Sequence, residues 1–152
     1  MDWTLEMVVV PVSNVDRAKA FYTDQLGFRV DHDTVISAEE RLVQLTPPGS
    51  ACSIAIGTVR PSTGSVEMAA GSLQHLQLVV SDLPAARAEL VERGVDVSEI
   101  QVYDEGSLRV YRHDDGLDNV GFVFFCEPDG NGWVVQQISS RGESHHSPRS
   151  LL

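Results

Sequence analysis

The sequence predicts an α+β domain in which two βαβββ modules form a curved mixed sheet with a concave cleft. Three observations support this fold class: apolar runs of strand length, two helical segments with caps, and a repeat of the same order of elements. One helix per module covers one face of a sheet, so the other face must be buried or used. The predicted domain spans 5–139, with module one at 5–58, a linker at 59–71 and module two at 72–139.

The first module begins with an apolar run from Leu5 to Val12, which predicts a strand. Ser13-Asn14 then offers a helix cap, apolar residues follow at helical spacing, and Gly27 ends the helix. Three further strands are expected at 28–31, 41–46 and 52–58, with the turn Pro47-Pro48-Gly49-Ser50 before the last of them.

The second module repeats this order, beginning with the apolar run Leu73 to Val80 and the cap Ser81-Asp82. Gly94 ends its helix, and further strands are expected at 95–103, 120–126 and 133–138. The polar stretch 104–119 predicts a long, lid-like loop, and residues 140–152 predict a flexible tail. Val12-Ser13-Asn14 aligns with Val80-Ser81-Asp82 at an offset of 68, and the last strands align at an offset of 81.

The charge of the chain narrows the classes of partner. The 22 Asp and Glu against 11 Lys and Arg give a net charge of −11. Such a field repels phosphate backbones, so we expect no nucleic-acid partner, and it favours cationic ligands. No apolar run approaches the roughly 20 residues of a membrane-spanning helix, so we expect no membrane partner. The first residues carry no basic segment, and we therefore expect a cytoplasmic protein.

Two segments resemble a known superfamily. The run Val10-Pro11-Val12-Ser13-Asn14-Val15-Asp16-Arg17-Ala18-Lys19-Ala20-Phe21-Tyr22 followed by Leu26-Gly27-Phe28 is similar to the opening of glyoxalase and bleomycin-resistance domains. Leu78-Val79-Val80-Ser81-Asp82-Leu83 and the turn Glu127-Pro128-Asp129-Gly130-Asn131 resemble the same vicinal oxygen chelate superfamily. The resemblance implies homodimers, and either enzymes such as glyoxalases and extradiol dioxygenases or non-catalytic proteins that sequester antibiotics. The enzymes commonly hold one divalent metal at four strand positions.

The resemblance places those four positions at Met7, Ala55, His75 and Gln136. The first-strand positions lie seven residues before the helix caps, and the last-strand positions follow from the offset of 81. His75 is a good ligand and Gln136 a weak one, whereas Ala55 has no donor atom and Met7 has only a thioether. If a divalent ion (Zn, Ni, Mn or Fe) binds, His75 and Gln136 are its expected ligands, in an incomplete set.

The remaining candidates line the predicted cleft or its lid. Gln77 should share a face with His75, so that His75, Gln77 and Gln136 form one polar patch suited to a small molecule. His75 is either a proton-transferring base or a structural hydrogen-bonded residue. Phe124 is either a core residue or a wall of the cleft. Arg109 and Tyr111 could close over an anionic ligand or remain in a solvated loop.

Three functions are compatible with this sequence. The first is a glyoxalase-like enzyme, of the lyase or isomerase type, that acts on a small carbonyl-containing metabolite through a metal or through His75 as a base. The second is a non-catalytic protein that binds and sequesters an antibiotic-like small molecule, and the missing metal ligands favour it. The third is a dimeric domain whose cleft no longer has a function.

Overall fold

The computed structural model describes residues 1–58 and 67–142. Part of the predicted linker, 59–66, and most of the predicted tail, 143–152, lie outside these residues. The chain forms two compact units. Unit 1 contains the described residues of 1–74 together with 127–131, and unit 2 contains the described residues of 75–126 and from 132 onward. The pairing of the modules into one curved sheet with a concave cleft stays a prediction.

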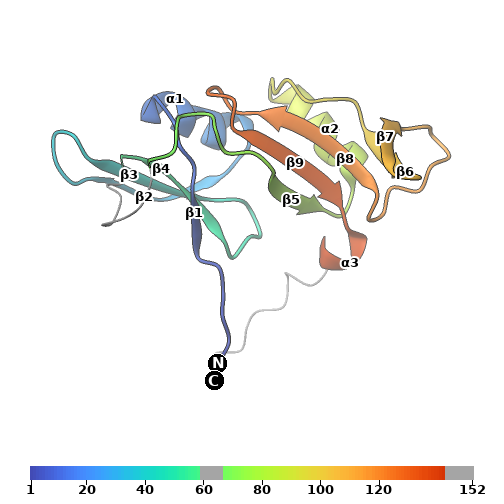
Figure 1. Cartoon of the computed structure of the whole chain (residues 1–152), viewed down its shortest axis with the longest axis horizontal. Coiled ribbons are helices and arrows are strands. Elements are labelled where there is room, and N and C mark those ends of the chain that lie inside the picture. Colours follow the sequence, from blue (N-terminus) through green and yellow to red (C-terminus); the bar gives the residue numbers. More distant parts are fainter. Residues whose placement is uncertain (59–66, 143–152) are drawn as a thin grey trace. The chain divides into compact units, whose positions relative to one another are not determined.

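Unit 1 has the predicted βαβββ order (Figure 1). Its elements are β1 (Met7–Val9), α1 (Val15–Ala20) with its π-helical continuation η1 (Phe21–Gln25), β2 (Arg29–Val35), β3 (Arg41–Thr46) and β4 (Ser53–Gly57). The sheet order is β1-β4-β3-β2, in which β1 runs parallel to β4 and the other pairs are antiparallel. The helix connects β1 at one edge of the sheet to β2 at the other edge. The antiparallel pairs β2-β3 and β3-β4 then bring β4 beside β1, to which it runs parallel.

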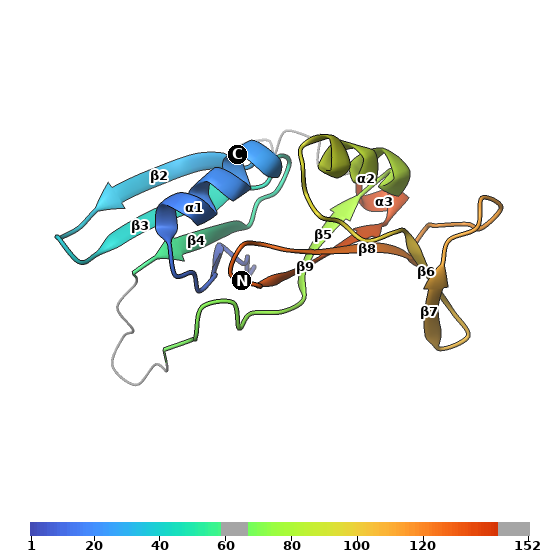
Figure 2. The ribbon, with the colours of Figure 1, turned by 90° about the horizontal axis from the view of Figure 1, so that it is seen from above.

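The helix of unit 1 begins and packs as its sequence predicts. The Asn14 side chain accepts a hydrogen bond from the Arg17 N–H at 3.0 Å, so this cap satisfies one of the free donors of the first turn. The helix lies over one face of the sheet (Figure 2). Val43, Leu45 and Ile56 share a face by register and are fully buried, which indicates that α1 covers this face. This packing forms the core of unit 1.

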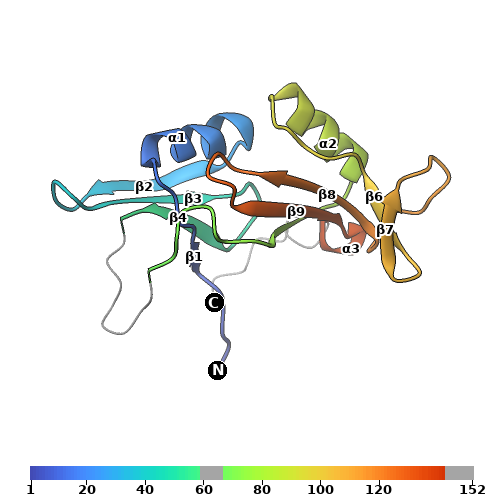
Figure 3. The same ribbon diagram turned by 45° about the horizontal axis from the view of Figure 1, so that its top comes forward.

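Unit 2 repeats the order and adds a strand (Figure 3). Its elements are β5 (Leu76–Val80), α2 (Leu83–Glu92), β6 (Gln101–Asp104), β7 (Ser107–Val110), β8 (Gly121–Cys126), β9 (Gly132–Gln137) and α3 (Ser139–Gly142). The sheet order is β5-β9-β8-β6-β7, with β5 parallel to β9. Asp82 caps α2 as Asn14 caps α1, which confirms the repeat at the offset of 68. In the described residues, no helix has the length and apolar character needed to cross a lipid bilayer.

The prediction of one long loop over 104–119 is wrong, because β7 forms a hairpin with β6 inside it. Asp104 pairs with Ser107, so Glu105 and Gly106 make a two-residue connection. Both have positive φ, at 48° and 87°, as the tightest hairpin turns require. The predicted strand at 95–103 is correspondingly shorter, since only 101–104 pair with neighbouring strands.

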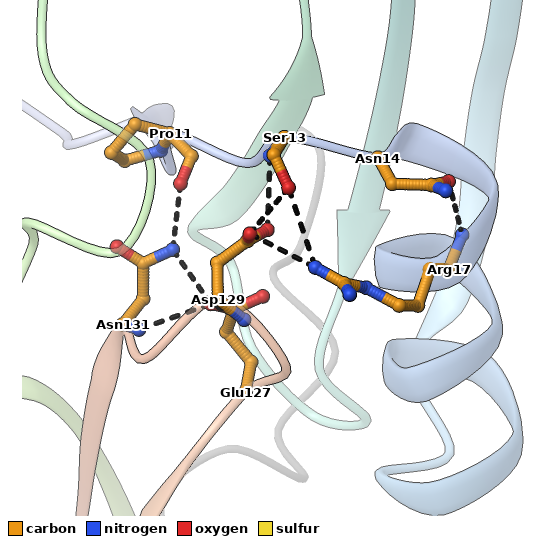
Figure 4. A network of polar contacts seen from close by, with 7 residues as sticks. All are labelled: Pro11, Ser13, Asn14, Arg17, Glu127, Asp129 and Asn131. Carbon is orange, nitrogen blue, oxygen red and sulfur yellow. Dashed lines mark hydrogen bonds and ion pairs between the residues drawn. The ribbon is translucent and has the colours of Figure 1, made fainter.

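The turn 127–131 joins β8 to β9 in sequence but belongs to unit 1 (Figure 4). Asp129 accepts hydrogen bonds from the Ser13 N–H at 2.9 Å and from the Ser13 hydroxyl at 2.5 Å, and it pairs with Arg17 at 2.9 Å. Asn131 is fully buried, and its Nδ2 donates to the Pro11 carbonyl at 2.7 Å. These contacts hold the turn against the residues that lead into α1.

The pKa values of two carboxyl groups in this turn are shifted in opposite directions. Glu127 is buried, and its burial raises its pKa although its Oε1 accepts hydrogen bonds from the N–H groups of Asp129 and Asn131. Burial also raises the pKa of Asp129, but the two hydrogen bonds from Ser13 and the charge of Arg17 outweigh it, and the pKa is lowered overall. Asp129 is therefore the ionised anchor of the turn.

We expect Asp129→Asn to destabilise the protein at neutral pH by about 1–3 kcal/mol, the range for lost hydrogen bonds to a charged group. The folded-state pKa of Asp129 is lowered, so its stabilisation is present above the unfolded pKa and is lost as the pH falls through the folded value. The difference in urea-unfolding free energy between wild type and variant should therefore shrink in acid. Asp114→Asn, at an exposed position, is the control. A difference that stays constant with pH would contradict this role.

Candidate functional site

The second sheet has one face that α2 does not cover. Strand registers pair Gln77 with Val134 and Val134 with Phe124, so these three side chains point to the same side. A second row of paired residues points to the same side and crosses the sheet from Val79 on β5 to Val110 on β7. We call this side the open face; its residues are Gln77, Val79, Val134, Gln136, Phe122, Phe124, Gln101, Tyr103, Leu108 and Val110.

The two faces differ in burial as well as in direction. On the α2 side, Trp133, Val135 and Val123 are each at most 3% exposed, and Gln137 Oε1 accepts a hydrogen bond from the Leu83 N–H at the start of α2. On the open face, Val79 and Val110 of the two edge strands are 37% and 64% exposed, whereas Val134 of β9 is only 8% exposed. Apolar side chains that stay partly accessible on one face of a sheet indicate a binding surface rather than a finished core.

Two glutamine amides lie at one end of the open face and are bonded to each other. Gln77 Nε2 donates to Gln136 Oε1 at 2.5 Å, and Gln136 Nε2 donates to the backbone carbonyl of Asn119 at 2.8 Å. Asn119 has a left-handed backbone with φ of 66°, a conformation that asparagine tolerates better than most residues. Its own N–H donates to the Gln137 carbonyl at 2.8 Å. The structure therefore brings Gln77 and Gln136 together, as predicted, and joins their side chains by a hydrogen bond.

Aromatic rings flank this amide pair on the neighbouring strand. Phe122 and Phe124 are stacked, with ring centroids 6.4 Å apart and an interplanar angle of 19°. Phe122 is the registered neighbour of Gln136, and Phe124 that of Val134. Both rings are half-buried, so each keeps a surface to which a ligand ring could pack. Phe124 lies on the open face and is not sequestered under α2.

His75 does not lie within the strand where the sequence analysis expected it. It precedes β5, is exposed, and has a left-handed backbone with φ of 66°. The strand begins one residue later because this conformation interrupts the extended backbone. The alternation of side chains along β5 therefore does not determine the direction of the His75 side chain. That His75 shares a polar patch with Gln77 and Gln136 stays a prediction. A bulky residue held at positive φ is strained, and such strain is often found at functional positions.

Met7 and Ala55 lie in the sheet of unit 1, on the face opposite to α1. Register places Met7 beside Ser53 and Val9 beside Ala55. Ala55 is fully buried and Met7 is half-buried. When the caps are superposed at the offset of 68, the last strands are related by 79 residues and not by 81. Val134 is therefore the counterpart of Ala55 by strand register, and the turn before β4 contains one more residue than the turn before β9.

The residues at the four family positions do not fit a divalent metal. They provide one imidazole, one neutral amide, one thioether and one methyl group, whereas zinc takes three ligands from His, Cys or carboxylate and harder ions take carboxylates. The Gln136 oxygen already accepts a hydrogen bond from Gln77. Among the described residues, no cluster of three or more His, Cys, Asp or Glu side chains is placed to hold an ion. We therefore assign no chemical step to a metal ion.

Arg109 and Tyr111 have contacts of their own in the hairpin region. Arg109 pairs with Val102, so its side chain leaves the sheet on the side opposite to the open face. Its guanidinium donates two hydrogen bonds of 2.7 Å to Asp115 and one of 3.1 Å to Asp104. The bonds from Arg109 hold the pKa of Asp115 well below its usual range. The Tyr111 hydroxyl donates to the His113 carbonyl at 3.3 Å. Ligand contacts of Arg109 and Tyr111 stay predictions.

Two residues of this site were missed by the sequence analysis. Phe122 lies two residues before Phe124, and strand alternation was sufficient to place it on the same face. Asn119 had no comparable signal, because it acts through its backbone carbonyl. That carbonyl is aimed by a left-handed conformation and by the fold of the loop before β8, neither of which a side-chain pattern reports.

Comparisons with known proteins agree with this architecture. Residues 4–135 match the family model of the Glyoxalase/Bleomycin resistance protein/Dioxygenase superfamily. YwkD, an uncharacterized protein of Bacillus subtilis (strain 168), is 28% identical over 129 residues, which cover 83% of this chain and 90% of that protein.

Solved structures of similar proteins include two from Streptomyces sp. CB03234. TnmS3, an antibiotic binding protein, is 28% identical with a TM-score of 0.67, and the match covers 91% of this chain and 98% of that one. A glyoxalase/bleomycin resistance protein is also 28% identical, with a TM-score of 0.64 and coverage of 88% and 100%. These likenesses extend over nearly the whole length of each chain.

The backbone of His75 allows a test of strain at this position. Replacing His75 with glycine removes a left-handed penalty of about 1 kcal/mol and partly offsets the entropic cost of glycine. The control is His113→Gly, at an exposed residue without positive φ, where only the cost applies. In urea unfolding, we expect His75→Gly to be less destabilised than His113→Gly by about 1 kcal/mol. Equal destabilisation of the two variants would show that His75 is not strained.

Proposed function

Because the chain belongs to the Glyoxalase/Bleomycin resistance protein/Dioxygenase superfamily, we propose that it binds and sequesters a small, flat and mostly apolar molecule without a metal. The open face of unit 2 carries this proposal. It combines accessible aliphatic and aromatic side chains with one fixed pair of amides, which is the usual composition of a small-molecule site. The likeness to TnmS3, an antibiotic binding protein, supports it.

The residues at the family's metal positions also favour binding over metal-dependent catalysis. A hydrolytic or isomerising metal centre needs carboxylate or imidazole ligands to set the charge at the ion, and here only His75 is of that kind. The amide pair cannot take up or release a proton near neutral pH. Gln77 and Gln136 can orient a ligand by hydrogen bonds and leave it chemically unchanged.

The acidic charge of the chain adds a preference among such ligands. With a net charge of −11, the protein attracts cations and repels anions at low ionic strength. This long-range attraction acts mainly on the rate at which a ligand associates. A flat aromatic molecule with a positive charge is therefore the ligand that the composition and the open face favour together.

A second candidate function is metal-free proton transfer by His75. The observations that favour it are that His75 is exposed just before β5 and has a left-handed backbone. An imidazole titrates near neutral pH and can accept a proton from a carbon next to a carbonyl. In this case His75→Gln would abolish turnover of a carbonyl substrate and leave ligand binding intact.

The dye Nile red, a neutral planar aromatic molecule, tests the proposed binding function. We expect its fluorescence titration to show saturable binding that weakens at least about fivefold in Phe124→Ala, because an aromatic contact contributes on the order of 1 kcal/mol beyond its buried area. Val91→Ala removes an exposed apolar side chain of α2 and serves as the matched control. Circular dichroism checks that each variant is folded.

The cationic analogue Nile blue then tests the charge preference. It should bind more tightly than Nile red in dilute buffer, and the difference should fall as salt is added. Identical affinity of wild type, Phe124→Ala and Val91→Ala for Nile red would contradict a site on the open face.

A further inference from the structure

The amide pair of the open face has a fixed direction. An amide nitrogen and an amide oxygen are hard to tell apart by position alone, but a backbone carbonyl can only accept a hydrogen bond. Gln136 lies 2.8 Å from the Asn119 carbonyl, so its nitrogen must face that oxygen. Its own oxygen then faces Gln77, which must present its nitrogen in return. Asn119 therefore sets the orientation of both side-chain amides.

This direction determines which groups of Gln77 are left for a ligand. One N–H of Gln77 is used by Gln136, and the other N–H and the carbonyl Oε1 are not. Within 1–58 and 67–142, no side chain or backbone group bonds to either of them. Gln77 is exposed, so both can be reached from solvent. The residue thus presents one donor and one acceptor of the same planar amide.

The surroundings of this amide are flat and apolar. Val134 is the registered neighbour of Gln77 on β9, and Phe124 is the neighbour of Val134 on β8. Strands lie about 4.8 Å apart, so Phe124 stands roughly 10 Å across the sheet from Gln77. Val134 lies between them with 8% of its surface exposed, and Phe122 stacks against Phe124. A planar ring system that lies over Val134 would meet Gln77 at one edge and an aromatic wall at the other.

From this geometry we propose that the open face recognises a fused-ring lactam or imide. Its ring N–H would donate to Gln77 Oε1, its carbonyl oxygen would accept the remaining Gln77 N–H, and its rings would contact Val134 and Phe124. The proposal rests on the proposed binding function and names the chemical class of its ligand. It also makes Gln136 a positioning residue, which acts on the ligand only by orienting Gln77.

A matched pair of probes tests this assignment. The lactam 2-quinolone has the required adjacent N–H and carbonyl, and N-methyl-2-quinolone has the same rings without the donor. By isothermal titration calorimetry, we expect wild type to bind 2-quinolone about tenfold more tightly, because N-methylation removes one hydrogen bond and leaves the Gln77 carbonyl without its donor. Gln77→Leu should reduce this ratio to about one. Glu92→Leu, which replaces an exposed polar side chain of α2 away from the open face, should leave it unchanged.

Gln136→Leu separates a positioning role from a structural one. It should reduce the preference for the lactam while the affinity for N-methyl-2-quinolone stays as in wild type. A loss of general structure would weaken both probes together.

The outcomes distinguish this proposal from the binding function on which it rests. If the two quinolones bind equally to wild type, or if the preference survives Gln77→Leu, the lactam assignment is wrong. The same holds if neither quinolone binds although Nile red does and Phe124→Ala weakens the dye. If Nile red also ignores Phe124→Ala, the open face is not a binding site and both proposals fail.

Discussion

A β-strand sends alternate side chains to opposite faces of its sheet, and each unit of this chain has one long helix to cover one of those faces. In unit 2 this constraint places Val123 and Val135 on the side of α2 and Val79 and Val134 on the open face, where Val79 is exposed and Val134 is 8% exposed. The amide pair lies on the same side as the open-face valines. The site therefore follows from register: a shift of one residue in β9 would turn Gln136 toward α2.

Residues with positive φ mark the places where the regular pattern is interrupted. The Asn119 carbonyl accepts a hydrogen bond from Gln136, His75 immediately precedes β5, and Glu105 is the first residue of the turn between β6 and β7. Each is held there by neighbouring hydrogen bonds or strand pairing at a conformational cost. The turn 127–131 shows the complementary case, in which an ionised Asp129 and buried Asn131 fasten a loop to unit 1 by charge-assisted and backbone contacts.

The sequence predicted the order of elements well, because apolar period, caps and turn glycines are local signals. The caps Asn14 and Asp82 and the strand Arg41–Thr46 were placed correctly. The additional strand β7 was missed because its residues are polar or exposed and only the turn at Gly106 announces it. In the site, Gln77 with Gln136 followed from alternation, whereas the role of Asn119 depends on backbone geometry. The family's metal set could be placed on the chain, but its chemistry was not retained there.

The central claim is that a small molecule binds the open face of unit 2 and not the α2 side. Methyl-resolved NMR tests it directly, because β5 and β9 carry valines on the open face and β8 and β9 carry valines on the α2 side. During titration with Nile red, the methyl signals of Val79 and Val134 should shift progressively, and those of Val123 and Val135 should move little. Shifts confined to Val123 and Val135, or shifts of similar size at all four valines, would contradict the account.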